Sequence, residues 1–268
     1  MKNLLFLFGV VGFVVLCGRM PISAQSNDSV VSVGDTGRVV EDMQRGFSPY
    51  AWIDSLHLGK QRHKFSAGDL VLPVGLLLSG TLITAVPKWH GEIDFQLRDA
   101  LQADGHACRE LENGFQYLPV VSLVLLKLCG VRSEHAWRDL LTLGAGTYLV
   151  GSVLLNTVKY STSVLRPDES RYNSFPSGHA FTAFAGAELI RLEYGRRYPG
   201  IAVMGYVMAS GVGFMRMYNN RHWFSDVLMG AALGILSARF TYWIAPLLHK
   251  KKQRKQQHIQ ALLKMKGW

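Results

Sequence analysis

The stretch from Arg216 to Asp226, Arg-Met-Tyr-Asn-Asn-Arg-His-Trp-Phe-Ser-Asp, brings a cation, an imidazole and a carboxylate close together in the chain. If the segment that starts at His222 is helical, His222 and Asp226 stand four residues apart and share one helix face. The carboxylate can then hold the imidazole in one tautomer and raise its basicity. An ordinary His–Asp pair on a helix surface has the same spacing, so this motif alone does not establish a site.

A second motif, Pro176-Ser177-Gly178-His179, is predicted to open a helix. Glycine lets the backbone approach a ligand closely, and the first N–H groups of a helix point toward an anion. The hydroxyl of Ser177 adds a further polar group. The alternative is a serine that caps the helix and is followed by an ordinary histidine.

A third motif lies further toward the amino terminus. Lys159 and Arg166 follow an uncharged apolar stretch, and Pro167 comes directly after the arginine. Two cations at the end of an apolar helix can bind an anion. Basic residues also commonly flank the ends of helices at a membrane interface, so this motif is weak when taken by itself.

Taken together, the three motifs have the spacings Lys-x6-Arg-Pro, Pro-Ser-Gly-His and Arg-x5-His-x3-Asp, and each lies at a helix end on one predicted face. This pattern resembles the type 2 phosphatidic acid phosphatase superfamily, which includes vanadium haloperoxidases and bacterial acid phosphatases. The resemblance covers roughly Leu140 to Leu248 and implies an all-α bundle with a metal-free phosphatase site. One departure is Met215, because the family often has a serine directly before the third-motif arginine.

The resemblance also implies a role for each motif residue. His222, oriented by Asp226, would attack phosphorus and form a phosphohistidine. His179 would protonate the leaving oxygen and then activate water for the second step. Three cations, a hydroxyl and a backbone N–H would bind the phosphate oxygens, and these belong to Lys159, Arg166, Arg216, Ser177 and Gly178. No carboxylate cluster that would hold magnesium is apparent in the sequence, so we predict no metal, no cofactor, activity undiminished by EDTA and inhibition by vanadate.

The elements that must position these motifs are predicted to be helices. Six apolar stretches alternate with polar turns, strand-type alternation is absent, and frequent Gly and Ala suit close helix–helix packing. The sequence therefore predicts an all-α bundle of about six helices, which we expect to be embedded in a membrane. The stretches are Leu70–Val86, Tyr117–Val131, Leu140–Val158, His179–Ile190, Gly200–Met215 and Val227–Leu248.

An amphipathic surface helix is predicted between the first two stretches, within Glu92–Asn113. Helical spacing places four apolar residues on one face, namely Ile93, Leu97, Ala100 and Leu101. Three charged residues lie off that face, namely Asp94, Arg98 and Asp99. We expect this helix to lie on a bilayer interface or across the bundle.

The amino terminus has the form of an export signal. Lys2 precedes a run of 14 apolar residues, Leu4–Cys17, and small residues up to Ala24 offer a cleavage point. Such a run is short for a membrane span of about 20 residues, so we predict a signal peptide rather than an anchor. The predicted divisions of the chain are a signal peptide at 1–24, a polar arm at 25–65, the phosphatase bundle at 66–248 and a basic tail at 249–268.

Charge predicts an orientation for the bundle. The formal net charge is +10, and much of it sits in the basic tail, where no nucleic-acid motif accompanies it. Because positive loops stay in the cytoplasm, the tail and the Arg191–Arg197 loop would lie inside, and the loops at 159–179 and 216–226 would face the periplasm. A cleaved signal leaves one crossing too many before residue 159. Either one of the first three stretches does not cross, or the first segment is an extra anchor, or the bundle is soluble or peripheral in the periplasm.

The predicted function is a metal-independent phosphatase of the bacterial inner membrane that acts on phosphorylated envelope lipids, with membrane lipids around it and no nucleic-acid partner. Candidate substrates are lipid A phosphates, undecaprenyl pyrophosphate, phosphatidylglycerol phosphate and phosphatidic acid. The alternative enzyme is a broad-specificity soluble periplasmic acid phosphatase. A haloperoxidase would use the same cradle for bound vanadate. The non-enzyme alternative is an inactive membrane protein that binds lipid phosphates, against which the intact motif residues argue.

Overall fold

A computed structural model describes residues 66–102 and 112–265 of the chain, with side chains as far as Pro246. The predicted signal peptide at 1–24 and the polar arm at 25–65 lie outside the described residues. Contacts divide the chain into two compact units. One comprises residues 1–56 and 126–131, and the other comprises residues 57–125 and 132–268, which carry the bundle.

The described residues are helical and contain no strand, which confirms the predicted fold class. Each of the six predicted apolar stretches falls in a helix. Those six helices are α4 (Gly68–Ala85), α8 (Leu118–Leu128), α9 (Trp137–Ser161), α10 (Gly178–Tyr194), α11 (Pro199–Tyr218) and α12 (Phe224–Met265). Shorter elements are α5 (Pro87–Trp89), the π-helix η1 (His90–Phe95), α6 (Gln96–Gln102) and α7 (Glu112–Phe115).

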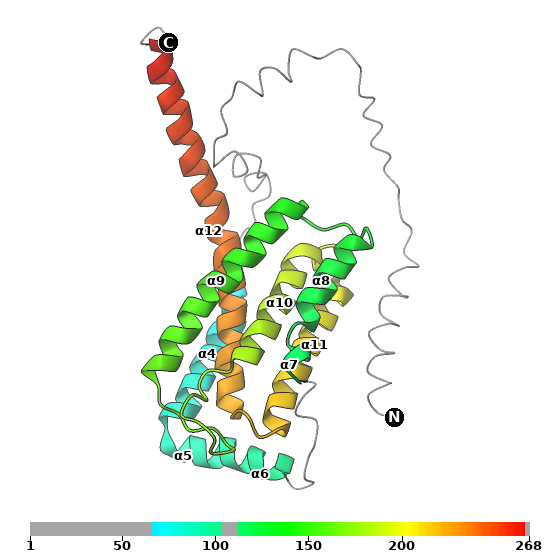
Figure 1. The fold of residues 1–268 in the computed structure, drawn as a ribbon, viewed down its shortest axis with the longest axis vertical. Coiled ribbons are helices and arrows are strands. Elements are labelled where there is room, and N and C mark those ends of the chain that lie inside the picture. Colours follow the sequence, from blue (N-terminus) through cyan, green and yellow to red (C-terminus); the bar gives the residue numbers. More distant parts are fainter. Residues whose placement is uncertain (1–65, 103–111, 266–268) are drawn as a thin grey trace. The chain divides into compact units, whose positions relative to one another are not determined.

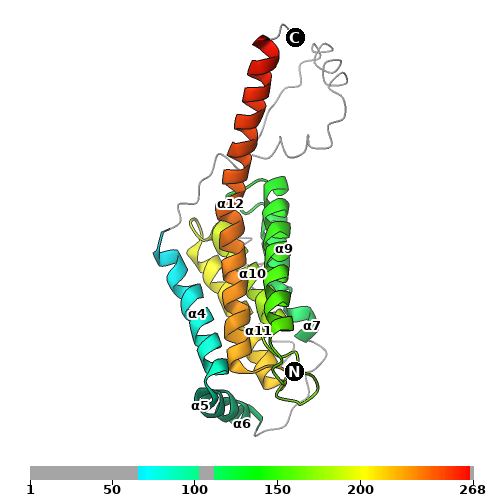
Figure 2. The same ribbon diagram turned by 90° about the vertical axis from the view of Figure 1, so that its left-hand side faces the viewer.

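Helix α10 packs between α11 and α12, and α12 also packs against α4 and α9 (Figure 1). Helices α9 and α11 run toward one end of this bundle, while α10 and α12 start there and run away from it (Figure 2). Helix α4 ends at the same end and leads into α5, η1 and α6. The three sequence motifs stand at these helix ends, so the connectivity alone gathers them at one end of the bundle.

Four helices in the described part of the chain are long and apolar enough to cross a membrane: Gly68–Ala85, Trp137–Ser161, Pro199–Tyr218 and Phe224–Pro246. Helix α8 is apolar but shorter, at 11 residues. A hydrocarbon core about 30 Å thick needs about 20 apolar residues of helix. The chain is therefore a membrane protein, and the soluble alternative is not supported.

Two glycines of α12 let it cross α10 at close range. A Cβ at Gly230 would lie 2.4 Å from the Ser177 carbonyl oxygen, and one at Gly234 would lie 2.6 Å from that of Phe181. Such contacts are impossible for any larger residue without moving a backbone. The close crossing brings the first turn of α12, with its histidine and carboxylate, beside the first turn of α10.

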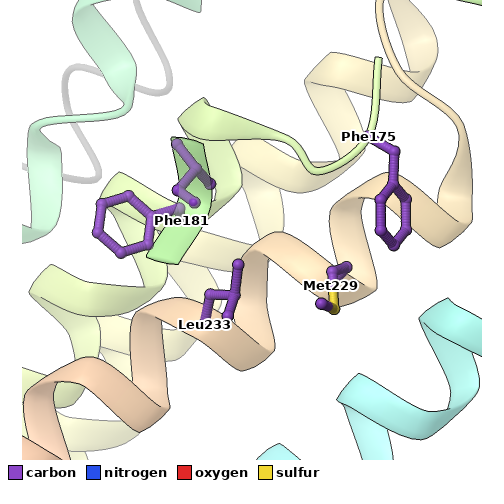
Figure 3. Packing of buried hydrophobic residues seen from close by; sticks show 5 residues of the cluster. Phe175, Phe181, Met229 and Leu233 are labelled. Atoms are coloured by element: carbon purple, nitrogen blue, oxygen red, sulfur yellow. The ribbon is translucent and has the colours of Figure 1, made fainter. Parts of the chain in front are cut away.

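An apolar cluster next to this crossing fixes the loop that carries the second motif. Phe175 of that loop is buried together with Phe181 of α10 and with Met229 and Leu233 of α12 (Figure 3). Leu155 of α9 completes the cluster. Burial of large apolar side chains stabilises a fold by about 1.5–3 kcal/mol each. The loop before α10 is thus held by packing as well as by hydrogen bonds.

The surface segment after α4 differs from the prediction at Asp94. The first half of this segment is the π-helix η1. Ile93 of the predicted apolar face is 38% exposed, and Asp94, which was expected off that face with the other charged residues, is 1% exposed. A π-turn closes i→i+5 hydrogen bonds, so the face repeats at a wider interval than in the α-helix used for the prediction.

Candidate active site

His222 and Asp226 are paired as the four-residue spacing predicts. The Nδ1 of His222 lies 3.2 Å from Oδ2 of Asp226, and both side chains are buried. A carboxylate only accepts hydrogen bonds, so Nδ1 carries the proton that it donates and Nε2 carries the lone pair. The arrangement presents a nucleophilic nitrogen on the opposite side of the ring from Asp226.

Asp226 is held in place by three donors. Its Oδ2 accepts the backbone N–H of Trp223 at 2.8 Å and the hydroxyl of Ser174, in addition to the imidazole of His222. Its backbone carbonyl accepts the N–H of Ser177 at 3.0 Å. These bonds tie the third motif directly to the loop that carries the second.

Burial sets the protonation of His222. His222 lies in the turn between α11 and α12, and burial lowers its pKa below the ordinary value, more than offsetting the opposite effect of Asp226. The imidazole of His222 is therefore neutral near pH 7. A neutral ring with its lone pair on Nε2 is the form that can attack phosphorus.

Ser177 and Gly178 form the start of α10. Ser177 is the N-cap, and its Oγ accepts the N–H of Ala180 at 3.4 Å, which is the capping interaction left open by the sequence. The side chain of Ser177 is fully buried. A Cβ on Gly178 would meet only Leu155 at ordinary contact distance, so this position is not crowded.

His179 stands on the first turn of α10, among the cations of the other motifs. It lies within electrostatic reach of Arg216, Arg166 and Lys159, and also of His222. Its Nε2 lies 3.0 Å from the amide oxygen of Asn113 in α7. His179 and His222 therefore lie within electrostatic range of each other.

Asn173 orients the two cations of the first motif. Lys159 Nζ donates to the backbone carbonyl of Asn173 at 3.0 Å, and Arg166 Nε donates to its side-chain oxygen at 3.0 Å. Both acceptors are neutral, so neither cation is neutralised by a carboxylate through these bonds. Arg166 is half-buried, and burial lowers the pKa of its guanidinium, which nonetheless stays charged.

Arg216, the cation of the third motif, is buried at the end of α11. It is electrostatically coupled to Lys159 and to both histidines. All three cations thus lie within electrostatic range of His179. Asp226 offsets part of this positive charge at Lys159 and Arg166, and an anionic ligand would offset more of it.

The loop between α9 and α10 is braced at its outer edge. Arg221 Nη1 donates to Asp168 Oδ2 at 2.9 Å, and Ser170 also bonds to this carboxylate. Burial raises the pKa of Asp168, but the bonds from Ser170 and the Arg221 charge outweigh it, and the net pKa is lowered. Asp168 is therefore ionised at neutral pH and ties the first motif to the third.

Several residues of this site carry no sequence signal. Asn173 and Ser174 lie in an irregular loop without periodicity, and Asn113 precedes the bundle helix α8. Their contacts cross 14, 52 and 66 residues of sequence, to Lys159, Asp226 and His179 respectively. Within the described residues, no group of three or more His, Cys, Asp or Glu side chains is placed to hold a metal ion.

The comparison with known families agrees with this geometry. Residues 140–250 match the sequence model of the PAP2 superfamily, the family of type 2 phosphatidic acid phosphatases. The matched range contains all three motifs and the four helix ends that carry them. A PAP2 superfamily domain therefore occupies this part of the chain.

Two curated relatives also match the sequence. The chain is 34% identical over 240 residues to a protein of Porphyromonas gingivalis named lipid A 1-phosphatase, a match covering 88% of this chain and 50% of that protein. The chain thus spans about half the length of this relative. A protein of Bacillus licheniformis named bacitracin transport permease protein BcrC is 40% identical over 76 residues, which cover 28% of this chain and 36% of that one.

Two solved structures also show similarity. LpxE of Aquifex aeolicus matches with a TM-score of 0.43 and 22% identity, over 55% of this chain and 93% of that chain. A transmembrane PAP2-type phosphatidylglycerolphosphate phosphatase of Bacillus subtilis matches with a TM-score of 0.42 and 22% identity, over 69% of this chain and 96% of that chain.

Proposed function

We propose that this protein is a metal-independent phosphatase that removes a phosphate group from an envelope lipid through a phosphohistidine intermediate at His222. The observation that carries the proposal is the convergence of three cations and two histidines at one end of the bundle, with Asp226 bonded to Nδ1 of His222. Phosphoryl transfer needs positioning and neutralisation of charge more than covalent chemistry by the protein. This cluster supplies both.

In the first step, Lys159, Arg166 and Arg216 bind the oxygens of the phosphate group, assisted by the Ser177 hydroxyl and the Gly178 N–H. The planar fork of arginine suits bidentate binding of these oxygens. Nε2 of His222 then attacks phosphorus, and the P–O bond to the leaving group breaks. Asp226 accepts the hydrogen bond of the cationic ring that results.

His179 completes both halves of the reaction. As an acid it gives its proton to the leaving oxygen, so that the dephosphorylated lipid departs as an alcohol. As a base it then takes a proton from water, whose oxygen attacks phosphorus and breaks the P–N bond. Inorganic phosphate leaves, His222 regains its neutral form and His179 regains its proton.

We also propose that the site faces the periplasm. Helices α10 and α12 run away from the site, and each leads into basic sequence, the Arg191–Arg197 loop and the tail after residue 249. Positively charged segments stay in the cytoplasm, so the opposite end of the bundle lies outside. In this orientation the start of α4 is cytoplasmic, because α4 ends on the site side. Alternate cysteine labelling at exposed Tyr172 and exposed Arg196 in intact cells tests the assignment.

Among phosphorylated lipids we favour the 1-phosphate of lipid A. This choice rests on the relative in Porphyromonas gingivalis that is named lipid A 1-phosphatase. Four apolar helices long enough to cross a membrane support a site near a membrane surface, where such a headgroup lies. They also make a lipid a better substrate than a soluble phosphomonoester.

A substrate panel with purified full-length protein tests the proposed function. Lipid A, undecaprenyl pyrophosphate, phosphatidylglycerol phosphate, phosphatidic acid and a soluble aryl phosphate are compared by release of inorganic phosphate. We expect release from lipid A that EDTA does not reduce, that vanadate inhibits and that His179→Ala loses.

Equal phosphate release by wild type and His179→Ala would contradict the proposal. Faster turnover of the aryl phosphate than of every lipid would favour a broad-specificity acid phosphatase. Tight binding of lipid A without any release would favour an inactive lipid-binding protein. Loss of activity with EDTA and recovery with magnesium would overturn the metal-independent mechanism.

A further inference from the structure

A second buried carboxylate lies beside the site, and the reaction described above does not use it. Asp94 of η1 is 1% exposed. Its Oδ1 accepts the backbone N–H of Ser225 at 3.0 Å, and its Oδ2 accepts the Ser225 hydroxyl at 2.6 Å. His90 Nδ1 lies 2.7 Å from the same Oδ2. A surface segment after α4 is thereby joined to a residue 131 positions later.

Ser225 is the second residue of α12 and lies between His222 and Asp226 in the chain. The first N–H groups of a helix have no partner within the helix, and a carboxylate placed there also interacts favourably with the helix dipole. Asp94 therefore caps α12 from outside. It does so at the turn whose geometry decides where the imidazole of His222 points.

Ring contacts reinforce this connection at the neighbouring residue. The Trp223 ring lies 4.7 Å from the Phe95 ring and 5.1 Å from the His90 ring, measured between centroids. The Arg98 guanidinium lies 5.5 Å from the Trp223 ring. The indole N–H of Trp223 donates to the Leu165 carbonyl at 2.7 Å, next to the first motif. The surface segment that contains η1 thus contacts both Trp223 and Ser225, the two neighbours of Phe224 in the chain.

We propose that Asp94 is a positioning residue for the phosphatase reaction. It fixes the first turn of α12, so that Nε2 of His222 stays in line with the phosphorus of the bound substrate. This inference rests on the proposed function, because it assigns the alignment to the nucleophile of that reaction. A cap that only stabilised α12 would affect the folding of the protein without changing the rate at which folded protein turns over.

Steady-state kinetics of the full-length protein in detergent separate these roles. In Asp94→Ala we expect kcat to fall about 10- to 100-fold, because small misplacements of a reacting group have effects of this size. KM and inhibition by vanadate stay near their wild-type values, since Lys159, Arg166 and Arg216 are untouched. Asp94→Asn recovers most of the loss, because its amide oxygen still accepts the Ser225 N–H.

Two further variants complete the design. Ser225→Ala removes one of the two hydrogen bonds and produces a smaller fall in kcat. Glu92→Ala is the matched control: Glu92 lies two residues earlier in the same segment, its side chain is 55% exposed and it is paired with the exposed Lys88. We expect its kinetics to equal those of wild type.

Hydrogen exchange of the segment 219–228 gives a readout that does not need activity. We expect faster exchange there in Asp94→Ala and Ser225→Ala, but not in Glu92→Ala. If wild type releases phosphate from no substrate, the proposed function fails while faster exchange still supports the restraint by Asp94.

Three results would overturn the positioning role. One is an unchanged kcat in folded Asp94→Ala. Another is a loss of vanadate affinity as large as the loss of kcat, which would mean that the whole cradle had loosened. If Asp94→Ala does not fold, wild-type kcat and wild-type exchange in both Asp94→Asn and Ser225→Ala would reduce Asp94 to a structural cap.

Discussion

Arginines and lysines meet two different environments in this bundle. Inside it, Glu188 of α10 is completely buried and accepts Arg239 Nε at 2.6 Å and Arg191 Nη2 at 2.6 Å, as well as the Tyr206 hydroxyl. At the site end, Lys159 and Arg166 bond instead to the neutral oxygens of Asn173. The inner cations are paired with a carboxylate, and the outer ones are oriented by an amide and a carbonyl.

This difference separates cations that hold the fold from cations that receive a ligand. A buried ion pair must be matched within the protein, because an unpaired charge away from water is very unfavourable. A cation intended for phosphate keeps its charge available only if its orienting partner is neutral. The choice of Asn173 rather than an acid is thus a physical signature of an anion site, and four predictions test it.

The largest effect is expected from removing Arg239, one of the donors to the buried Glu188. Arg239→Ala leaves Glu188 with fewer donors in a fully buried position, which should destabilise the fold by about 3–5 kcal/mol. Thermal unfolding in detergent measures the change, with Arg138→Ala at an exposed position of α9 as the control. The folded fraction should keep its kcat. An Arg239→Ala protein as stable as wild type would show that the inner pairing does not hold the bundle.

Arg166→Ala should lower the activity and leave the stability of the fold unchanged. Removing one preorganised contact to the transferring phosphoryl group lowers turnover about 10²- to 10³-fold, while the thermal midpoint stays near that of wild type. Phosphate release measures the effect. The control is Arg171→Ala, whose side chain is exposed in the same loop. Equal activities of the two variants would remove Arg166 from the cradle.

Asn173→Asp replaces the neutral partner of Arg166 by a carboxylate, like the one that Glu188 offers to Arg239. A carboxylate beside Arg166 would pair with it and repel the phosphate, so we expect kcat/KM to fall about tenfold, because solvent and salt screen most of the repulsion. Gln96→Glu adds the same charge at an exposed position of α6 and should have no effect. Full activity of Asn173→Asp would mean that neutrality at this position is irrelevant.

The features of the site that depend on local spacing could be predicted from the sequence. The His222–Asp226 pair follows from an i,i+4 relation, and the helix ends that carry Lys159 and Ser177 follow from apolar stretches and capping residues. Six stretches predicted six helices for the same reason.

The rest depends on contacts between distant segments. Asn173 lies in a loop with no periodic pattern, and its two bonds exist only because α9 and that loop meet in space. Asp94 could not be found, because a π-turn changes its face and its partner Ser225 is 131 residues away. Ser177 was correctly placed, but only the structure shows that its oxygen caps α10.

The pH dependence should show the smallest effect. Burial lowers the pKa of His222 below its ordinary value of about 6.5, so the imidazole that we propose as the nucleophile is neutral at neutral pH. Burial and the nearby cations lower the pKa of His179 to about 3. The negative charge of a bound phosphate offsets these cations, and lower pH favours the proton that this histidine donates in the proposed reaction. We therefore expect kcat to hold or rise modestly when pH falls from about 8 to about 6, measured with lipid substrate. A fall of kcat over that interval would contradict a buried, neutral nucleophile.

Trapping the covalent intermediate tests the central claim most directly. Full-length protein is mixed with substrate carrying a labelled phosphate, quenched in alkali, which preserves phosphohistidine, and digested for peptide mapping. We predict label on His222, less label in Arg166→Ala and none in His222→Ala. Label on any other residue, or turnover of His222→Ala at the wild-type rate, would contradict the account.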